Sequence, residues 1–510
     1  MLAKLNSYGL IGIDGCPISV EVDLSRGMQR ADTVGLPDNA VKESKERVRS
    51  AITNSGHQYP EMRVLVNLAP ADIRKEGTVY DLPIALGILA ARGVFPLHAA
   101  DEYIVIGELA LDGQVRSVTG VLPMVIDAHE RGFRNIILPY ENAEEASFFA
   151  DMNVFPVRTL NEACGHLNGT ARITPVPPLK WSGQKHVYPY DFSEIKGQQA
   201  AKRAAEIAAA GNHNLLLIGS PGSGKTMLAR SIPSILPELT MEESLEITRI
   251  HSVAGELKGR SGIVTERPFR APHHSASIPA LVGGGSRALP GEISLAHYGV
   301  LFMDEFPLFP TTVLEALRQP LEDGVITITR AAAKTSFPAE FMLVAAMNPC
   351  PCGNYGSKTK ECRCSAMQIE KYRGRISSPL LDRLDIHVEM NEVNYDDLIS
   401  KQEGESSASV KERVNAARMR QRARYRDEGI LFNAQLNTPL MRKYCRMDED
   451  AEALLHAAYD KLKLSARAYT RVIKVARTIA DIAGEERIRK PHVLEAVQYR
   501  GLDEKYWGSR

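Results

Sequence analysis

Residues 219–226 read Gly219-Ser220-Pro221-Gly222-Ser223-Gly224-Lys225-Thr226, between an apolar strand-like stretch (214–218) and a helix-like one (227–231). Glycines let backbone N–H groups turn inward toward an anion, and the N-terminus of the following helix adds positive potential. The stretch therefore predicts that these eight residues bind the phosphates of ATP, with Lys225 at the β- and γ-phosphates and the Thr226 hydroxyl on Mg²⁺. The alternative is a chance glycine- and serine-rich turn, which would not require this strand and helix.

A second apolar stretch, 299–303, leads directly into two carboxylates, Asp304 and Glu305. We predict that Asp304 joins the magnesium shell and that Glu305 orients and deprotonates the attacking water. Alone, this pattern would be an ordinary strand that ends in two acidic residues. Downstream of a complete phosphate loop, it predicts an ATP hydrolase with an α/β core and a parallel sheet.

The composition is that of a globular protein with balanced charge. The chain has 510 residues, of which 62 are acidic and 62 basic, so a basic field over the whole surface is excluded. Any nucleic-acid contact must then come from local patches. The first twenty residues have no signal-peptide core, and the longest apolar run, 82–91, is too short for a bilayer. We expect a cytoplasmic protein that does not contact membranes.

Periodicity and composition predict three domains. Strand-like and helix-like stretches alternate in the first part of the chain, prolines concentrate at 174–178, and the last part has a helical pattern throughout. The predicted domains are an α/β domain at 1–165, a linker at 166–189, an ATPase core at 190–396 that contains a cysteine loop at 350–364, and an all-α lid domain at 397–510.

Two stretches of the last domain have distinct patterns. Apolar residues recur at helical spacing over 472–482, with Ser465 as a candidate N-cap and Gly484 as a candidate stop. The stretch 411–426 instead holds seven basic residues against one acidic residue, spread over two helix faces. We interpret it mainly as a solvated helix, with nucleic-acid binding as the alternative.

With these motifs and their flanks, the chain closely resembles the YifB/ComM family of magnesium-chelatase-like AAA+ ATPases over nearly its whole length. Other family-like stretches are 33–37, 67–72, 267–274 and 382–385. The resemblance implies a homo-hexameric ring motor that remodels DNA, by branch migration of recombination intermediates as in natural transformation. A motor that remodels a partner protein, or one of the magnesium-chelatase type, is the alternative.

The resemblance assigns further residues to the ATP site. It implies Asn348, after the strand-like stretch 341–347, as a sensor of the γ-phosphate or water, and Arg383 as the arginine finger. It also implies Arg467 as the second sensor arginine, from the lid, and places Ile195 and Gly197 at the adenine pocket. An arginine from a neighbouring subunit stabilises charge on the transferred phosphoryl group, so turnover would require a ring.

Three of these residues have alternatives that the sequence leaves open. Arg383 could pair with Asp382 or Asp385, Asn348 could be a turn residue before a proline, and Arg471 lies one helical turn from Arg467.

About 80 residues separate Lys225 from Asp304, more than a nucleotide-binding core needs. The excess contains 281–287, which resembles the helix-2 insertion of this clade, and 325–334 resembles its second hairpin. The resemblance implies that both project into the pore of the ring. Arg287, Arg330 and Lys334 would then line a basic channel for single-stranded or branched DNA. Solvated surface loops are the alternative.

The first domain resembles the Lon-protease/ribosomal-S5-like fold at 75–81 and 107–109. Proteases of that type use a serine nucleophile and a lysine base, but Val79 and Leu122 stand at the approximate positions, and 76–179 contains no lysine. We therefore predict no peptidase activity. The domain is expected to dock protein partners or to guide the substrate.

Four of the seven cysteines fall within the cysteine loop, as Cys350, Cys352, Cys362 and Cys364. Four thiolates can surround one zinc ion tetrahedrally, and a loop this small cannot build an apolar core of its own. The sequence therefore predicts a zinc site, with four free thiols as the alternative.

Overall fold

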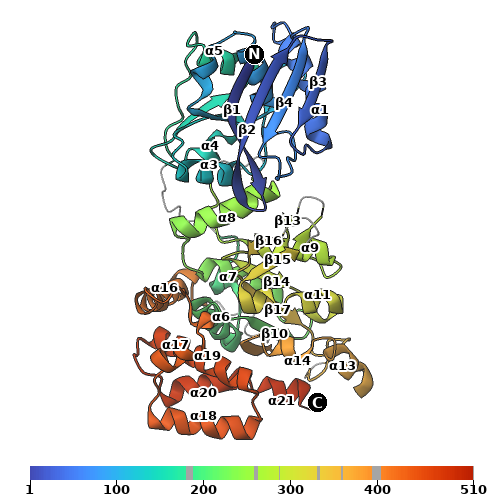
Figure 1. Ribbon diagram of the computed structural model, residues 1–510. Coiled ribbons are helices and arrows are strands. Elements are labelled where there is room, and N and C mark those ends of the chain that lie inside the picture. The colour runs from blue at the N-terminus through green and yellow to red at the C-terminus, as the bar shows by residue number, and fades with distance from the viewer. Residues whose placement is uncertain are drawn as a thin grey trace. The chain divides into compact units, whose positions relative to one another are not determined.

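The computed structural model describes residues 1–179, 188–257, 262–285, 288–329, 334–357, 360–392 and 404–508 (Figure 1). The chain forms two compact units. The first comprises Met1–Ser182 and Ser244–Val264, and the second comprises Gly183–Glu243 and Thr265–Arg510. Residues 244–264 thus group with the first unit although they lie inside the predicted ATPase core. The predicted fold class, α/β with a parallel core sheet and a helical C-terminal region, is confirmed.

The first unit is built on a seven-stranded mixed sheet with strand order β3-β4-β2-β1-β5-β8-β9. Alternate residues of β2 are buried, so one face of the strand packs on the core. The strands are β1 Leu2–Ile11, β2 Asp14–Ser25, β3 Arg30–Val34, β4 Arg63–Ala69, β5 Tyr103–Val105, β8 Asn135–Pro139 and β9 Asn153–Val157, with a separate hairpin of β6 Glu108–Leu109 and β7 Val115–Arg116.

Helices complete the core of the first unit. Every residue of α2, Asp81–Ala91, is buried, as its nearly all-apolar sequence predicts. Arg47 donates to the buried Asp81 carboxylate at 2.8 Å, and burial raises the pKa of Asp81 to about 6. The other helical segments are α1 Asn39–Asn54, η1 Leu97–Ala100, α3 Val121–Glu130, η2 Tyr140–Asn142, α4 Ala143–Ala146 and α5 Leu160–Leu167, and α8 Met241–Ala254 joins the unit from Ser244 onward.

The second unit contains a five-stranded sheet with strand order β11-β14-β17-β10-β18, in which all paired strands are parallel. Its central strands are buried along their whole length, as expected for a parallel sheet that is covered on both faces. The strands are β10 Leu215–Gly219, β11 Phe269–Arg270, β14 Val300–Met303, β17 Met342–Met347 and β18 Ile386–Met390.

Two antiparallel hairpins and several short helices accompany this sheet. The hairpins are β12 Gly283–Gly284 with β13 Leu289–Pro290, and β15 Val325–Thr329 with β16 Lys334–Pro338. The helical segments are η3 Phe192–Glu194, α6 Gln199–Gly211, α7 Lys225–Ile235, α9 Ile278–Val282, α10 Glu292–Leu295, η4 Phe306–Leu308, α11 Thr311–Ala316, α12 Pro320–Asp323, α13 Ala366–Arg373 and α14 Ser378–Leu381.

The C-terminal part of the second unit is helical (Figure 1). Ser465 caps α19 through the backbone N–H of Ala468, and Gly484 ends the helix at a φ of 78°, so both predicted boundaries are confirmed. The segments are α16 Ser407–Arg424, η5 Asn433–Gln435, α17 Thr438–Tyr444, α18 Glu449–Leu462, α19 Ala466–Ala483, α20 Lys490–Gln498 and α21 Leu502–Trp507.

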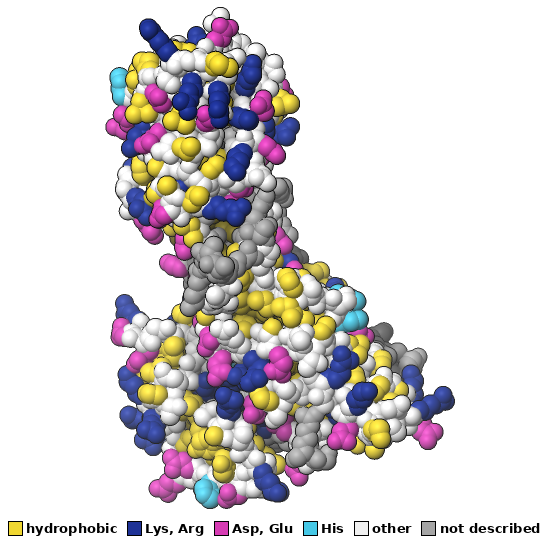
Figure 2. Space-filling model, turned by 45° about the vertical axis from the view of Figure 1, so that its right-hand side comes forward, with side chains coloured by type: hydrophobic (Ala, Val, Ile, Leu, Met, Phe, Trp, Pro, Cys, Tyr) yellow, Lys and Arg dark blue, Asp and Glu magenta, His cyan; other side chains and the backbone are white. Residues whose placement is uncertain are grey.

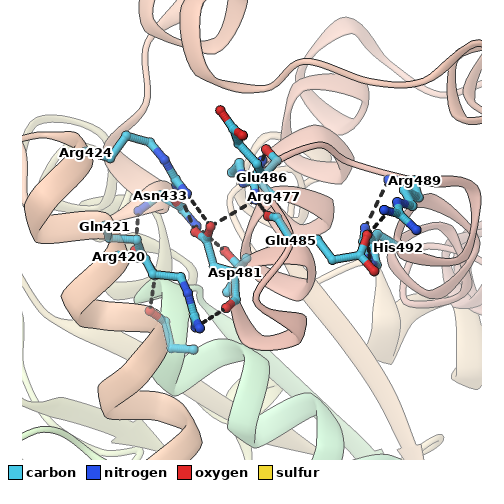
Figure 3. Close-up of polar contacts among 12 residues, drawn as sticks. Arg420, Gln421, Arg424, Asn433, Arg477, Asp481, Glu485, Glu486, Arg489 and His492 are labelled. Atoms are coloured by element: carbon cyan, nitrogen blue, oxygen red, sulfur yellow. Dashed lines mark hydrogen bonds and ion pairs between the residues drawn. The ribbon is translucent and has the colours of Figure 1, made fainter.

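A buried carboxylate, Asp481, joins α16, η5 and α19 (Figure 3). It accepts from Arg424 at 2.9 Å and from Asn433 at 2.8 Å, and it lies 3.0 Å from the guanidinium of Arg477. The side chains of Asp481 and Arg477 are 0% and 1% exposed. We call Asp481, Arg424, Asn433 and Arg477 the lid network.

The surface matches the balanced charge of the sequence. Acidic and basic side chains intermingle over the face shown in Figure 2. Among the helices of the described residues, none combines the length and the apolar character that crossing a bilayer requires.

Candidate nucleotide site

The phosphate loop joins the carboxyl end of β10 to the first turn of α7. Gly222 and Gly224 adopt φ angles of 81° and 91°, a left-handed conformation that side chains with a Cβ rarely adopt. Gly224 is also the N-cap of α7. Glycine at these two positions therefore permits the backbone turn in which N–H groups can point toward an anion.

Lys225 lies folded back over this loop. Its Nζ donates to the carbonyls of Gly219 and Ser220 at 2.7 and 2.9 Å, and to Oδ1 of Asn348 at 3.2 Å. Burial lowers the pKa of the ammonium group, and the charge of Asp304 acts in the opposite direction. Asn348 follows β17, the strand beside β10, so sheet order brings the predicted sensor to the predicted phosphate ligand.

The two predicted magnesium ligands meet at the same edge of the sheet. The Thr226 hydroxyl donates to Oδ2 of Asp304 at 2.9 Å, and the backbone N–H of Glu305 donates to Oδ1 at 2.8 Å. A hydroxyl and a carboxylate are the oxygen ligands that Mg²⁺ takes beside nucleotide phosphates. The residues present therefore fit a magnesium ion.

Glu305 is held in an unusual conformation beside a histidine that sequence reasoning did not assign to it. Its φ is 52°, in the left-handed region, and its side chain is 49% exposed. Nδ1 of His274 lies 2.9 Å from Oε2 of Glu305. His274 follows β11, which pairs with β14, the strand that precedes Glu305. The contact between His274 and Glu305 depends on β11 lying next to β14 in the sheet. Local sequence patterns do not predict that strand order.

The two predicted arginines lie together, away from the phosphate loop. Arg383 is buried, donates to the Pro379 carbonyl at 2.7 Å and pairs with Glu322. The Arg467 guanidinium lies 3.8 Å from the same Glu322 carboxylate. Arg383 thus takes neither of the aspartate partners that the sequence left open.

Asp385, one of those aspartates, pairs with Arg471 at 2.8 Å instead. Burial alone would raise the pKa of the Asp385 carboxyl, but the charge of Arg471 and contact with His213 hold that pKa well below its usual range. Arg471 is therefore committed to a buried ion pair, which leaves Arg467 as the exposed candidate for the second sensor.

The predicted adenine-pocket segment contacts the phosphate loop through a residue that the sequence analysis missed. Ile195 is buried at the end of η3, and Gly197 has a φ of 63°. The next residue, Gln198, donates to the carbonyl of Ser223 at 3.2 Å and to that of Asn391 at 2.6 Å. Its side-chain amide therefore ties this segment to the loop and to the end of β18.

Three residues are predicted to contact DNA: Arg287, Arg330 and Lys334. Arg287 and Arg330 lie outside the described residues. Lys334 begins β16, where it pairs in register with Thr329, but its side chain is not described.

The four predicted zinc ligands converge in the cysteine loop, of which residues 358 and 359 lie outside the described part. Their Sγ atoms all lie within 4.8 Å of one another, and the distances among Cys350, Cys352 and Cys362 are 3.4, 3.7 and 3.7 Å. Backbone N–H groups of Asn354 and then Arg363 lower the pKa of the Cys352 thiol to about 6. The loop begins two residues after Asn348.

In the first unit, the positions that a Lon-type dyad would use carry apolar side chains. Val79 and Leu122 are both buried in the core. The nearby Lys75 is fully buried as well, and its Nζ donates to the carbonyls of Pro70 and Ile73, the latter at 2.8 Å.

The parallel sheet and its phosphate loop define a P-loop domain, and its residues match a family model of magnesium-chelatase subunits. Residues 191–398 match the model of magnesium chelatase subunit ChlI, residues 20–142 match a second ChlI region, and residues 404–500 match the ChlI C-terminal region. The chain belongs to the YifB/ComM family of magnesium-chelatase-like AAA+ ATPases, which confirms the resemblance drawn from its motifs.

Two relatives match over nearly the full chain, and a third matches over a shorter region. The competence protein ComM of Haemophilus influenzae is 45% identical over 98% of both chains. The protein YifB of Escherichia coli is 44% identical over 98% of this chain and 97% of its own. The magnesium-chelatase 67 kDa subunit of Chlorobaculum parvum is 27% identical over a shorter region, 31% of this chain and 23% of its own.

Proposed function

We propose that the protein is an ATP-hydrolysing ring motor that remodels DNA. The observation that carries the hydrolytic part is the meeting of Thr226 and Asp304 at 2.9 Å, with Glu305 directly beside them. Thr226 lies in the first turn of α7, after β10, and the two carboxylates directly follow β14 of the same sheet. Their types are those that magnesium-dependent phosphoryl transfer uses.

Each residue has a role in this proposal. Lys225 exchanges its carbonyl contacts for β- and γ-phosphate oxygens, while Thr226 and Asp304 hold the Mg²⁺ that arrives with ATP. Glu305 orients the attacking water and accepts its proton, and Asn348 positions the water or the γ-phosphate. Ile195 and Gly197 border the adenine. When bound, a magnesium ion would neutralise negative charge on the phosphates.

Arg383 completes the site from another subunit as the arginine finger, and Arg467 adds the second sensor arginine from the lid. Both approach the Glu322 carboxylate, and neither has a described polar contact with the phosphate loop. A guanidinium supplied in trans stabilises the transferred phosphoryl group and makes hydrolysis depend on assembly. We therefore propose a homo-hexameric ring, as the family resemblance implies.

DNA is the substrate that we favour. The Haemophilus relative, which matches over nearly its full length, is named a competence protein. The chain also has two short hairpins, β12–β13 and β15–β16, that overlap the two stretches resembling the pore hairpins of the clade. Arg287, Arg330 and Lys334, repeated around a ring, would form a basic channel that attracts single-stranded or branched DNA. A magnesium-chelatase-type motor that acts on a partner protein is the second candidate, supported by the region shared with the Chlorobaculum subunit.

The remaining expectations belong to the same proposal. Four cysteine thiolates would hold one Zn²⁺, the first unit would dock protein partners without peptidase activity, and the protein would work in the cytoplasm. We also propose the domain limits that sequence periodicity and composition predict, which are 1–165, 166–189, 190–396 and 397–510.

The test is a steady-state ATPase assay with and without single-stranded or branched DNA at low salt, where the electrostatic attraction is strongest. We expect DNA to stimulate hydrolysis in the wild type and not in an Arg330→Ala/Lys334→Ala variant. The matched control is Arg487→Ala/Lys490→Ala, which removes two exposed cations from the helical region. If DNA has no effect at low salt, while a chelatase-type partner protein stimulates hydrolysis, the second candidate replaces the first.

A further inference from the structure

The cysteine loop packs directly on the phosphate loop. A Cβ added to Gly353 would lie 2.5 and 2.7 Å from Cδ and Cγ of Pro221, closer than carbon atoms can approach without displacement. Pro221 is the third residue of the phosphate loop. The two loops therefore touch with no room for one additional methyl group, and movement of one must be transmitted to the other.

The sulfur geometry fits a tetrahedral metal. With Zn–S bonds of about 2.3 Å, the edges of a ZnS₄ tetrahedron measure about 3.8 Å. The observed Sγ–Sγ distances of 3.4, 3.7 and 3.7 Å lie near that value, and all four cysteines are free of disulfides. Among the described residues, this is the group of ligands that could hold a metal ion. Softness and geometry favour zinc over magnesium or calcium.

The base of the cysteine loop is fixed independently of any metal. The Arg373 guanidinium lies 4.6 Å from each of the ring centroids of Tyr355 and Tyr506, and its Nε donates to the Pro349 carbonyl at 3.0 Å. The Tyr355 N–H in turn donates to Sγ of Cys350 at 3.3 Å. One side of the sulfur cluster is thereby anchored to the fold.

The other side of the cluster lies nearer to solvent. Cys352 is exposed, and Cys362 and Cys364 are half-buried. Gly353 is adjacent to the exposed Cys352, and its N–H donates to the Cys350 carbonyl at 3.0 Å, so the residue that touches Pro221 lies between the exposed side and the anchored base. A metal that joins all four sulfurs would tie this exposed side to the anchored base.

We propose that the four thiolates hold one zinc ion, and that this ion braces the phosphate loop through Gly353, so that nucleotide affinity depends on zinc. Zinc binding stands on the cysteine loop alone, whereas its effect on affinity rests on the proposed nucleotide site. Asn348 connects to the same brace, because it lies two residues before Cys350 and contacts Lys225. Loss of zinc would disturb the phosphate loop and the sensor together.

The first experiment measures metal in the full chain purified under reducing conditions. Mass spectrometry of the metal content should find one zinc per chain, and a Cys352→Ser/Cys362→Ser variant should lose it. Absence of zinc from the wild type would overturn the proposal.

The second experiment uses two glycines of the same loop as a matched pair. Gly353 and Gly356 have φ angles of 81° and 78°, so replacement by alanine strains both backbones alike, but a Cβ on Gly356 would meet nothing within 4 Å. We expect Gly353→Ala to retain zinc and to weaken binding of a fluorescent ATP analogue with Mg²⁺ by roughly tenfold. Gly356→Ala should retain both zinc and affinity.

A double-mutant cycle separates the contact from general damage. Pro221→Ala removes the two carbon atoms that the new methyl group would strike, so Gly353→Ala should weaken binding less in the Pro221→Ala background than in the wild type. The proposed brace would be contradicted if Gly353→Ala lowered the affinity for the analogue equally in both backgrounds. It would also be contradicted if Gly353→Ala and Gly356→Ala lowered that affinity equally. A zinc-depleted protein that binds the analogue as well as the loaded one would contradict it too. A wild type that holds zinc but binds no nucleotide would refute the ATP site instead, and with it the dependence on zinc.

Discussion

The nucleotide site and the lid network use charged side chains in opposite ways. At the nucleotide site, Glu305 is half-exposed, and its described side-chain contact is the single one to His274 at 2.9 Å. In the lid network, Asp481 is fully buried and shared among two arginines and an asparagine. A charged side chain near solvent that has few partners, such as Glu305, can give up those partners to contact a ligand. A buried carboxylate surrounded by donors cannot change partners without a large cost, so it holds structure.

The largest expected effect is catalytic and leaves stability alone. Glu305→Gln keeps the size of the side chain but removes the base, and general-base catalysis contributes about 10²–10⁴-fold. We expect the ATPase rate of the assembled protein to fall by about that factor, with nucleotide binding and the unfolding midpoint unchanged. The Glu315→Gln variant, on α11, is the control. Hydrolysis that survives Glu305→Gln would remove this residue from the chemistry.

The next effect should fall on stability. Asp481→Asn leaves Arg477 and Arg424 buried without their counter-charge, and breaking a buried ion pair costs about 3–5 kcal/mol. Urea unfolding should report that loss in the free energy of unfolding. Asp460→Asn, in an exposed pair with His456, should leave stability unchanged. Similar curves for both variants would contradict the role assigned to the lid network.

A smaller effect is expected at the histidine that contacts the base. His274→Ala frees the Glu305 carboxylate to take other positions, and we expect a roughly tenfold fall in kcat, about 1.4 kcal/mol, with KM nearly unchanged. His273→Ala is the control, because His273 contacts Ser275, and its ring packs at a tilt against the ring of His274, with no described contact to Glu305. If both variants lose the same activity, the 2.9 Å contact is not what positions Glu305.

A further effect concerns the pH dependence of stability. Burial lowers the pKa of Lys474 in α19 from 10.5 to about 8, with the charge of Arg471 acting in the same direction. Between these two values the unfolded chain binds more protons at this site than the folded chain, so the contribution of Lys474 to stability rises with pH, by at most about 1.4 kcal/mol per unit.

The variant Lys474→Met should therefore be more stable than the wild type at pH 7, and the difference should narrow above pH 8. Chemical unfolding at a series of pH values measures this difference. Lys461→Met, at an exposed position of α18, should follow the wild type. If the difference in free energy of unfolding between Lys474→Met and the wild type grew with pH, the pKa of Lys474 would not be lowered in the folded protein.

Local sequence patterns predicted the elements well. The boundaries of α19 and the strand–loop–helix around Lys225 depend on neighbouring residues, and the structure has them at the expected places. Such features follow from periodicity, capping and turn chemistry.

Pairings between distant residues could not be predicted in the same way. The basic stretch 411–426 was expected to be mainly solvated, which holds for Arg422 and Arg426 but is wrong for Arg418, which is buried against the Ala209 carbonyl. Arg424 meets Asp481 only because α16 packs on α19. The contact of His274 with Glu305 likewise required the order of the strands.

The central claim is that the phosphate loop holds the triphosphate of ATP. Isothermal titration of a slowly hydrolysed ATP analogue with Mg²⁺ into the wild type and Lys225→Ala tests it most directly. We predict one nucleotide per wild-type chain at saturation and at least a hundredfold weaker binding by Lys225→Ala, because its charge at the phosphates is lost. Equal affinities, or no binding by the wild type, would contradict this account of the site.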